Sequence, residues 1–296
     1  PELNDESFLA LNGFEAEVNE PETNAFGYKK CCHVCFIAID PDNVVQPCWH
    51  RERYVWGNAL SHKPEVAIDE SEPDYVRSFG AEGISDMMTK CRDKGFFVTY
   101  NHPTWSLEDY TDYMGYKGMH AFEMFNGGCN AVGYDDYNPR VYDDILRSGN
   151  KIFCIGADDN HNGAPDSSRR SDSGWAWTTI KADKLDYATI TKALLDGSFY
   201  ASEGPEIHEL YVEDGVVHIK TSEVQGIHMA TAGRRKPSKL VPFDSDERVT
   251  EAEFLLDKDD VFFHIIVKDM HGRPAATRIY FLDEADFGIP PKEEIK

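Results

Sequence analysis

The chain has 296 residues, which is enough for one large or two ordinary domains with a packed core. Its apolar content of 41% and charged content of 28% are those of a globular protein rather than a disordered one. The net charge is −23, and no segment gathers the lysines and arginines into a stripe. The composition therefore argues against polymeric nucleic acid and membrane surfaces as partners, since both require clustered positive charge. A small phosphorylated substrate is compatible with it, because a bound metal ion can supply local positive charge.

The N-terminal residues and the cysteine content predict a protein of the cell interior. No apolar run approaches the roughly 18 residues that span a bilayer, and the first residues lack a signal-peptide pattern. The seven cysteines are odd in number, which is typical of reduced thiols rather than of a disulfide framework. These features predict a cytoplasmic location, with export of a longer precursor as the alternative. The sequence does not indicate an oligomeric state.

The first strands are predicted near the N-terminus. A strand is expected over Phe8–Leu11, with Glu15 just beyond it, and a second strand over His33–Ile39. The second strand begins within C-C-H-V-C at 31–35. A small zinc site there is one interpretation, but no second cysteine pair follows at zinc-finger spacing, which favours a buried strand with small thiol side chains.

Residues 41–80 are predicted to form a long covering or functional loop. Within it, His50 and His62 are either extra metal ligands or, as favoured here, plain loop histidines. A helix over Ala81–Lys94 follows, because its apolar residues recur at helical spacing and Gly95 ends it. Further strands are predicted over 96–100, 121–125, 152–155 and 175–181, and further helices over 138–148 and 185–195. This order is typical of an α/β domain, and barrel-like closure is the predicted form.

Past Ser202 the sequence changes to short β-rich segments separated by turn pairs such as Asp214-Gly215. No segment with helical periodicity intervenes. We expect a small all-β, antiparallel, sandwich-like domain. The predicted domains are residues 1–203 and 204–296.

Candidate metal ligands follow the predicted strands. The apolar run Ile152–Ile155 leads directly to Asp159 and His161, and a buried strand delivers such side chains to a site at its carboxyl end. A polar turn is the alternative for an isolated D-x-H. Other strand candidates end in, or run up to, Glu15, His33 and His102. Mixed oxygen and nitrogen ligands from several strands are typical of a Zn, Mn or Fe site and indicate metal-assisted hydrolysis, since nucleophile-elbow, phosphate-loop and dinucleotide motifs are absent.

On these residues the chain resembles the polymerase-and-histidinol-phosphatase (PHP) family of metal-dependent phosphoesterases. The motifs are G-F-E at 13–15, C-H-V at 32–34, N-H-P at 101–103, E-M-F-N at 123–126 and A-D-D-N-H at 157–161. Segments 174–177 and 193–205 resemble the end of that domain in members with a C-terminal β-domain, so the resemblance covers about residues 8–205. It implies a distorted (β/α)7-type barrel holding two or three metal ions that activate water for attack on phosphorus.

The resemblance also implies a role for each matching residue. Glu15 corresponds to a metal-bridging glutamate, and the terminal ligands correspond to His33, His102, Asp159 and His161. Among these, Glu15, His102 and Asp159 are the predicted catalytic residues. Asp158 is expected either to orient a ligand or to cap a surface turn.

The sequence departs from the family at its start. The family's D-x-H-x-H strand and T-D-H turn are absent, and no histidine precedes His33. We expect an N-terminally incomplete barrel from a longer protein, with evolutionary loss of half the metal site as the alternative. The chain is then expected to hold fewer metal ions than the family, one or none, and catalysis is expected of the longer parent.

Arg169 and Arg170 are candidates to clamp a substrate phosphate, with solvated loop arginines as the alternative. Trp105 and Tyr100 flank His102, and either stack on a base or, as favoured here, pack in the core.

The leading functional hypothesis is a metal-dependent phosphoesterase acting on a small phosphorylated compound, a nucleotide or sugar phosphate. The alternative is a non-catalytic PHP-like module for binding or assembly. A metal-dependent hydrolase of another bond is a third possibility.

Overall fold

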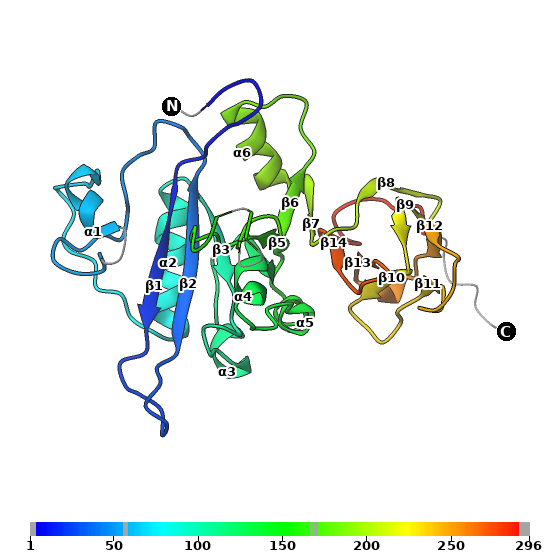
Figure 1. The fold of residues 1–296 in the computed structure, drawn as a ribbon, viewed down its shortest axis with the longest axis horizontal. Coiled ribbons are helices and arrows are strands. Elements are labelled where there is room, and N and C mark those ends of the chain that lie inside the picture. Colours follow the sequence, from blue (N-terminus) through cyan, green and yellow to red (C-terminus); the bar gives the residue numbers. More distant parts are fainter. Residues whose placement is uncertain (1–3, 56–58, 166, 169–170, 290–296) are drawn as a thin grey trace.

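The computed structural model describes residues 4–55, 59–165, 167–168 and 171–289. These residues form three β-sheets in two regions, the first flanked by helices and the second almost entirely β (Figure 1). Among them, no helix is both long enough and apolar enough to cross a membrane.

The first region is built on a five-stranded sheet with the order β1-β2-β3-β4-β5. Its strands are β1 (Gly13–Asn19), β2 (Cys31–Ala38), β3 (Phe96–Asn101), β4 (Ala121–Asn126) and β5 (Phe153–Ala157). The β1–β2 and β2–β3 pairs are antiparallel, whereas β3–β4 and β4–β5 are parallel. The carboxyl ends of β3, β4 and β5 therefore meet at one edge of the sheet, where β2 begins.

Short helices surround this sheet. They are α1 (Ala59–His62), η1 (Lys63–Glu65), α2 (Ala81–Asp93), α3 (Tyr110–Tyr113), α4 (Gly127–Ala131), α5 (Pro139–Arg147) and α6 (Tyr187–Asp196). Helix α2 presents Ile84, Met87, Met88 and Cys91 to the core, which is the apolar spacing that predicted it. Helix α6 ends at Gly197, whose left-handed backbone (φ 66°) terminates the helix.

The alternation of side chains along β2 gives the sheet two different faces. Val34 and Phe36 point into the large apolar core that α2 covers, while His33 lies on the opposite face. On that opposite face, Leu194 of α6 packs against Phe97 in a smaller apolar cluster. This packing covers one end of the face. The other end, which carries His33, lines a cavity.

The second region contains a seven-stranded sheet and a three-stranded sheet with apolar side chains between them. Its elements are β6 (Trp177–Ile180), β7 (Phe199–Ser202), β8 (Ile207–Glu213), β9 (Val216–Val224), β10 (Gly226–Thr231), β11 (Ser238–Leu240), β12 (Val249–Leu255), η2 (Lys258–Asp260), β13 (Phe262–Lys268), β14 (Pro274–Thr277) and β15 (Tyr280–Phe281). Strands β6 and β7 precede the predicted domain boundary, yet β7 pairs with β14 of the larger sheet (Figure 1). Thr178 of β6 also hydrogen-bonds the backbone of Gly156 in β5, so the first and second sheets adjoin.

The predicted α/β class with a (β/α)7-type barrel is wrong. The described residues are predominantly β, and their sheets do not close into a barrel. A β/α barrel requires a helix between successive parallel strands, whereas β1 and β2 form a hairpin and β2–β3 is antiparallel. After β5 the chain enters the other sheet through β6 instead of closing the first one.

The first predicted strand is also misplaced, because the strand runs over Gly13–Asn19 rather than Phe8–Leu11. Its sequence alternates apolar and acidic residues, so that Ala16 and Val18 face the core and Glu15 and Glu17 face the other way. Glu15 is therefore held within a strand rather than at a bend.

Candidate metal centre

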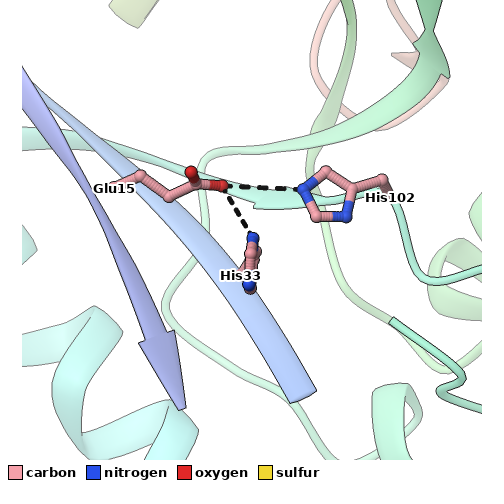
Figure 2. A group of neighbouring side chains, drawn as sticks. All are labelled: Glu15, His33 and His102. Atoms are coloured by element: carbon pink, nitrogen blue, oxygen red, sulfur yellow. Dashed lines mark hydrogen bonds and ion pairs between the residues drawn. The ribbon is translucent and has the colours of Figure 1, made fainter. Parts of the chain in front are cut away.

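Three potential metal ligands converge on the open face of the five-stranded sheet. A carboxylate oxygen of Glu15, from β1, lies 3.0 Å from Nδ1 of His33, from β2, and 3.5 Å from Nε2 of His102, which follows β3 (Figure 2). One ligand atom from each residue lies within 4.8 Å of the other two. One carboxylate and two imidazoles form a donor set that suits Zn, Mn or Fe.

The outward nitrogen of each imidazole also has a partner. Nε2 of His33 lies 3.2 Å from Oε2 of Glu17, and Nδ1 of His102 lies 3.3 Å from Oγ of Ser106. Metal-binding histidines usually have such an outer hydrogen bond, which fixes the tautomer and the ring orientation. The arrangement leaves the nitrogens facing Glu15 to act as ligands.

The β1–β2 register explains why Glu17 and Glu15 both reach His33. Glu17 lies directly opposite His33 across the strand pair, and Glu15 lies two residues away on the same face. A shift of one residue would turn both carboxylates to the apolar face. The hairpin pairing therefore positions one candidate ligand and its outer partner together.

The cluster forms part of the wall of a cavity of about 600 Å³. Trp105 also lines this cavity, with its ring centroid 5.1 Å from that of His33 and 5.3 Å from that of His102. The remaining lining residues are Gly128, Cys129, Ala131, Val132, Asp159, His161, Gly163 and Asp172. None of the described lining residues is a lysine or arginine.

Asp159 and His161 line the same cavity. Oδ2 of Asp159 is 3.8 Å from Nε2 of His102. The side chain of His161 is 75% exposed, and its Nδ1 lies 2.7 Å from the backbone oxygen of Asp159. The two residues lie beside the cluster of Glu15, His33 and His102 and are not among its three members.

Glu123 and Asn126, both from β4, connect the two parts of the site. Oε2 of the buried Glu123 accepts hydrogen bonds from the backbone N–H of His102 (3.0 Å) and from Nδ2 of Asn126 (3.0 Å). The Asn126 amide also donates to Oδ2 of Asp159 (3.2 Å). The sequence did not predict these contacts, or those of Glu17 and Ser106, because they depend on strand register and on the paths of loops. The motif E-M-F-N at 123–126 was a signal for Glu123 and Asn126.

The backbone is strained at two of the candidate ligands. His102 has a φ of 26° and Asp159 a φ of 50°, in the left-handed region that residues with a side chain rarely adopt. Such a conformation costs about 1–3 kcal/mol and persists where the surroundings enforce it, most often at functional sites. Gly128 permits the backbone of this loop to approach closely, since a Cβ there would lie 2.9 Å from the Asp159 carbonyl oxygen.

The cluster is strongly polarised. Burial opposes ionisation of Glu15, but hydrogen bonds from His102 and His33 keep the pKa of its carboxyl well below the usual range. Burial likewise opposes protonation of His33, yet hydrogen bonds with Cys31, Glu15 and Glu17 raise its pKa to about 12. The pKa of His102 is also raised, against burial, mainly by the hydrogen bond with Glu15. The ionised carboxylate of Glu15 therefore favours positive charge on its neighbours, and a cation bound there would lie next to this carboxylate.

The other candidates have different surroundings. The Asp158 carboxylate accepts hydrogen bonds from the backbone N–H groups of Gly174, Trp175 and Ala176, so it anchors that loop. Arg169 and Arg170 lie outside the described residues. The remaining candidates lie away from the cluster: His50 beside Asp74, His62 beside Glu65, and the buried Tyr100, whose hydroxyl donates to Glu108.

Comparisons of the chain with family models, with curated proteins and with solved structures gave no match.

Proposed function

We propose that the chain is the metal-binding part of a metal-dependent phosphoesterase that acts on a small phosphorylated compound, a nucleotide or sugar phosphate. The observation that carries the proposal is the convergence of Glu15, His33 and His102 on the wall of the cavity. The resemblance of their motifs to the PHP family supports the choice of a phosphate ester. A cytoplasmic location remains a prediction.

The residues fit a divalent metal ion. Glu15, His33 and His102 would hold it, and Asp159 borders the same space. When bound, the ion supplies Lewis-acid charge and lowers the pKa of coordinated water. The described lining residues include no lysine or arginine, and a bound metal ion would supply positive charge toward a phosphate.

The protein's own groups have separate tasks in this proposal. Glu17 and Ser106 hold the two imidazole rings in orientation. Trp105 packs against both rings and covers one side of them. Glu123 and Asn126 fix the backbone of His102 and the carboxylate of Asp159, which keeps the inner and outer parts of the site at a constant separation.

Metal content and phosphatase activity test the proposal together. The purified chain is loaded separately with Zn²⁺, Mn²⁺ or Fe²⁺, dialysed, analysed for bound metal and assayed with p-nitrophenyl phosphate. We expect the chain to retain metal with one of the ions, and any hydrolysis to require that ion. His102→Ala should abolish both, because it removes a buried ligand and leaves the Glu15 carboxylate with one fewer partner.

His62→Ala is the matched control, because His62 is exposed and pairs with Glu65 away from the cluster. It should retain metal and activity. Retention of metal without hydrolysis would instead favour the non-catalytic binding module. Activity that survives in both His102→Ala and Asp159→Ala would show that the site is assigned to the wrong residues.

A further inference from the structure

Two cysteines meet far from the candidate metal centre. Cys48 lies in the long segment between β2 and α2, and Cys91 lies on the buried face of α2. Their sulfur atoms are 3.8 Å apart, with the Cys91 thiol donating to the Cys48 sulfur. Among the described residues, no other hydrogen bond joins two cysteine side chains. Cys154, for example, donates to a backbone carbonyl.

The two thiols differ in access. Cys48 lines a cavity of about 520 Å³ between the 43–75 segment and the end of α2, together with Trp49, Tyr75 and Lys90. Cys91 is 0% exposed and does not line that cavity. A small reagent entering the cavity therefore meets Cys48 and not the buried Cys91.

The two thiols also differ in acidity. The hydrogen bond from Cys91 lowers the pKa of the Cys48 thiol, against the effect of burial, and the positive charge of Lys90 lowers it further. The same hydrogen bond, with burial, raises the pKa of Cys91. Because the thiolate is the reactive form of cysteine, Cys48 is the nucleophile of the pair and Cys91 remains a protonated partner.

The segment around Cys48 is held in place by specific contacts. Cys48 has a φ of 52°, in the left-handed region that a residue with a side chain adopts only when its surroundings enforce it. The backbone N–H of Tyr75 donates to the carbonyl of Trp49 (2.8 Å), and the Tyr75 hydroxyl donates to Asp86 of α2 (2.8 Å). These bonds keep the Cys48 sulfur beside Cys91.

We propose that Cys48 and Cys91 are a peroxide-sensitive thiol pair that forms a reversible disulfide between the 39–80 segment and α2. The Cys48 thiolate attacks one oxygen of hydrogen peroxide, the O–O bond breaks, and hydroxide leaves with a proton as water. The product is a sulfenic acid at Cys48. The Cys91 sulfur then attacks the Cys48 sulfur, the S–O bond breaks, and the hydroxide takes the Cys91 proton as a second water. Overall, two thiols and one peroxide give one disulfide and two waters.

A disulfide at this place has a measurable effect on the fold. It ties a long segment with little regular structure to a helix of the main core, and it closes a long loop of the unfolded chain. The oxidised protein should unfold at a midpoint higher by roughly 5 °C or more, and dithiothreitol should reverse the shift.

The pairing is tested on the whole chain with hydrogen peroxide. Free thiols are counted in denaturant before and after treatment, and peptides are mapped by mass spectrometry without reduction. We expect two fewer thiols than the seven of the sequence, a peptide linking Cys48 to Cys91, and its loss after dithiothreitol. Oxidation of other cysteines without a Cys48–Cys91 link would overturn the proposal.

Variants separate the two roles. In Cys91→Ala, the sulfenic acid at Cys48 should persist and be trapped by dimedone, whereas the unsubstituted chain should give little adduct. In Cys48→Ala, Cys91 should remain a free thiol because it is buried and does not line the cavity. Cys154→Ala is the control, since it removes a buried thiol without a sulfur neighbour and should still form the link. An equal dimedone adduct at Cys48 with and without Cys91 would show that Cys91 does not resolve it. The peptide map of the unsubstituted chain decides the pairing even if a variant does not fold.

Discussion

The two faces of the five-stranded sheet are made by the same strands but carry different chemistry. Toward α2, alternate residues such as Val34 and Phe36 are apolar and fully buried. On the other face, the intervening residue His33 joins Glu15 and His102 at the cavity wall. One face therefore supplies folding free energy, and the other concentrates polar groups that a stable core would not contain. Each can be perturbed separately.

Each face nevertheless contains a buried carboxyl group with a raised pKa. Burial raises the pKa of Glu108, on the α2 side, to about 7, against hydrogen bonds from Tyr116 and Tyr100. Burial raises the pKa of Glu123, on the site side, to about 7, against the charge of His102 and a hydrogen bond from Asn126. The first is enclosed by tyrosines of the core, whereas the second supports candidate ligands.

The largest expected effect is on the apolar face. Phe36→Ala should lower the free energy of unfolding by about 3–5 kcal/mol, because it removes a fully buried ring that packs on Phe14. Metal bound per folded molecule should not change. Denaturant unfolding and metal analysis of the folded fraction provide the measurement. Phe26→Ala, at an 86% exposed ring, should change stability by less than about 0.5 kcal/mol.

A smaller effect is expected from the buried carboxyl of the same face, and it depends on pH. The folded-state pKa of Glu108, about 7, lies above its ordinary value of 4.5, so the folded state binds the proton more tightly. The resulting stability is fully present below pH 4.5 and is lost as the pH rises to 7, a change of roughly 3 kcal/mol. In Glu108→Gln this loss should be absent. Unfolding of both proteins between pH 4 and 8 provides the comparison, and parallel pH profiles would contradict the assignment.

The smallest effect is expected on the site face. Glu17→Gln should lower metal affinity about 10- to 100-fold, because it weakens the carboxylate that orients His33, and should leave stability within about 0.5 kcal/mol. Glu253→Gln is the matched control, since Glu253 forms a similar pair with His218 (3.1 Å) in the second region. Metal titration of both variants distinguishes them. Equal losses of affinity would mean that His33 does not bind the metal.

Periodicity predicted the elements of the first region better than their arrangement. Helix α2 and strand β3 were located because their apolar patterns have a clear period and glycines mark their ends. Strand β1 was misplaced because the apolar run Phe8–Leu11 was preferred over the alternation at 14–18. The prediction of a closed barrel was wrong because the order of elements does not specify whether neighbouring strands are joined by a hairpin or by a crossover.

For the candidate site, the positions of strand ends predicted which candidate ligands lie close together, but not the residues that hydrogen-bond to them. Glu15, His33 and His102 do lie together, and their metal-binding role stays a prediction. Glu17, Ser106 and Asn126 were not found, because a contact across a strand pair or a turn depends on register and loop geometry. Asp159 and His161 line the same cavity, with Oδ2 of Asp159 3.8 Å from Nε2 of His102, and their role as ligands stays a prediction.

The pairing of β7 with β14 has a consequence for biosynthesis. Ser202 pairs with Ala275, so an inner strand of the larger sheet must wait for a partner that is synthesised much later. Until the ribosome has released β14, β7 presents an open edge, to which strands of other nascent chains can add. We therefore expect slower synthesis of the C-terminal region to lengthen the time during which the nascent protein depends on chaperones.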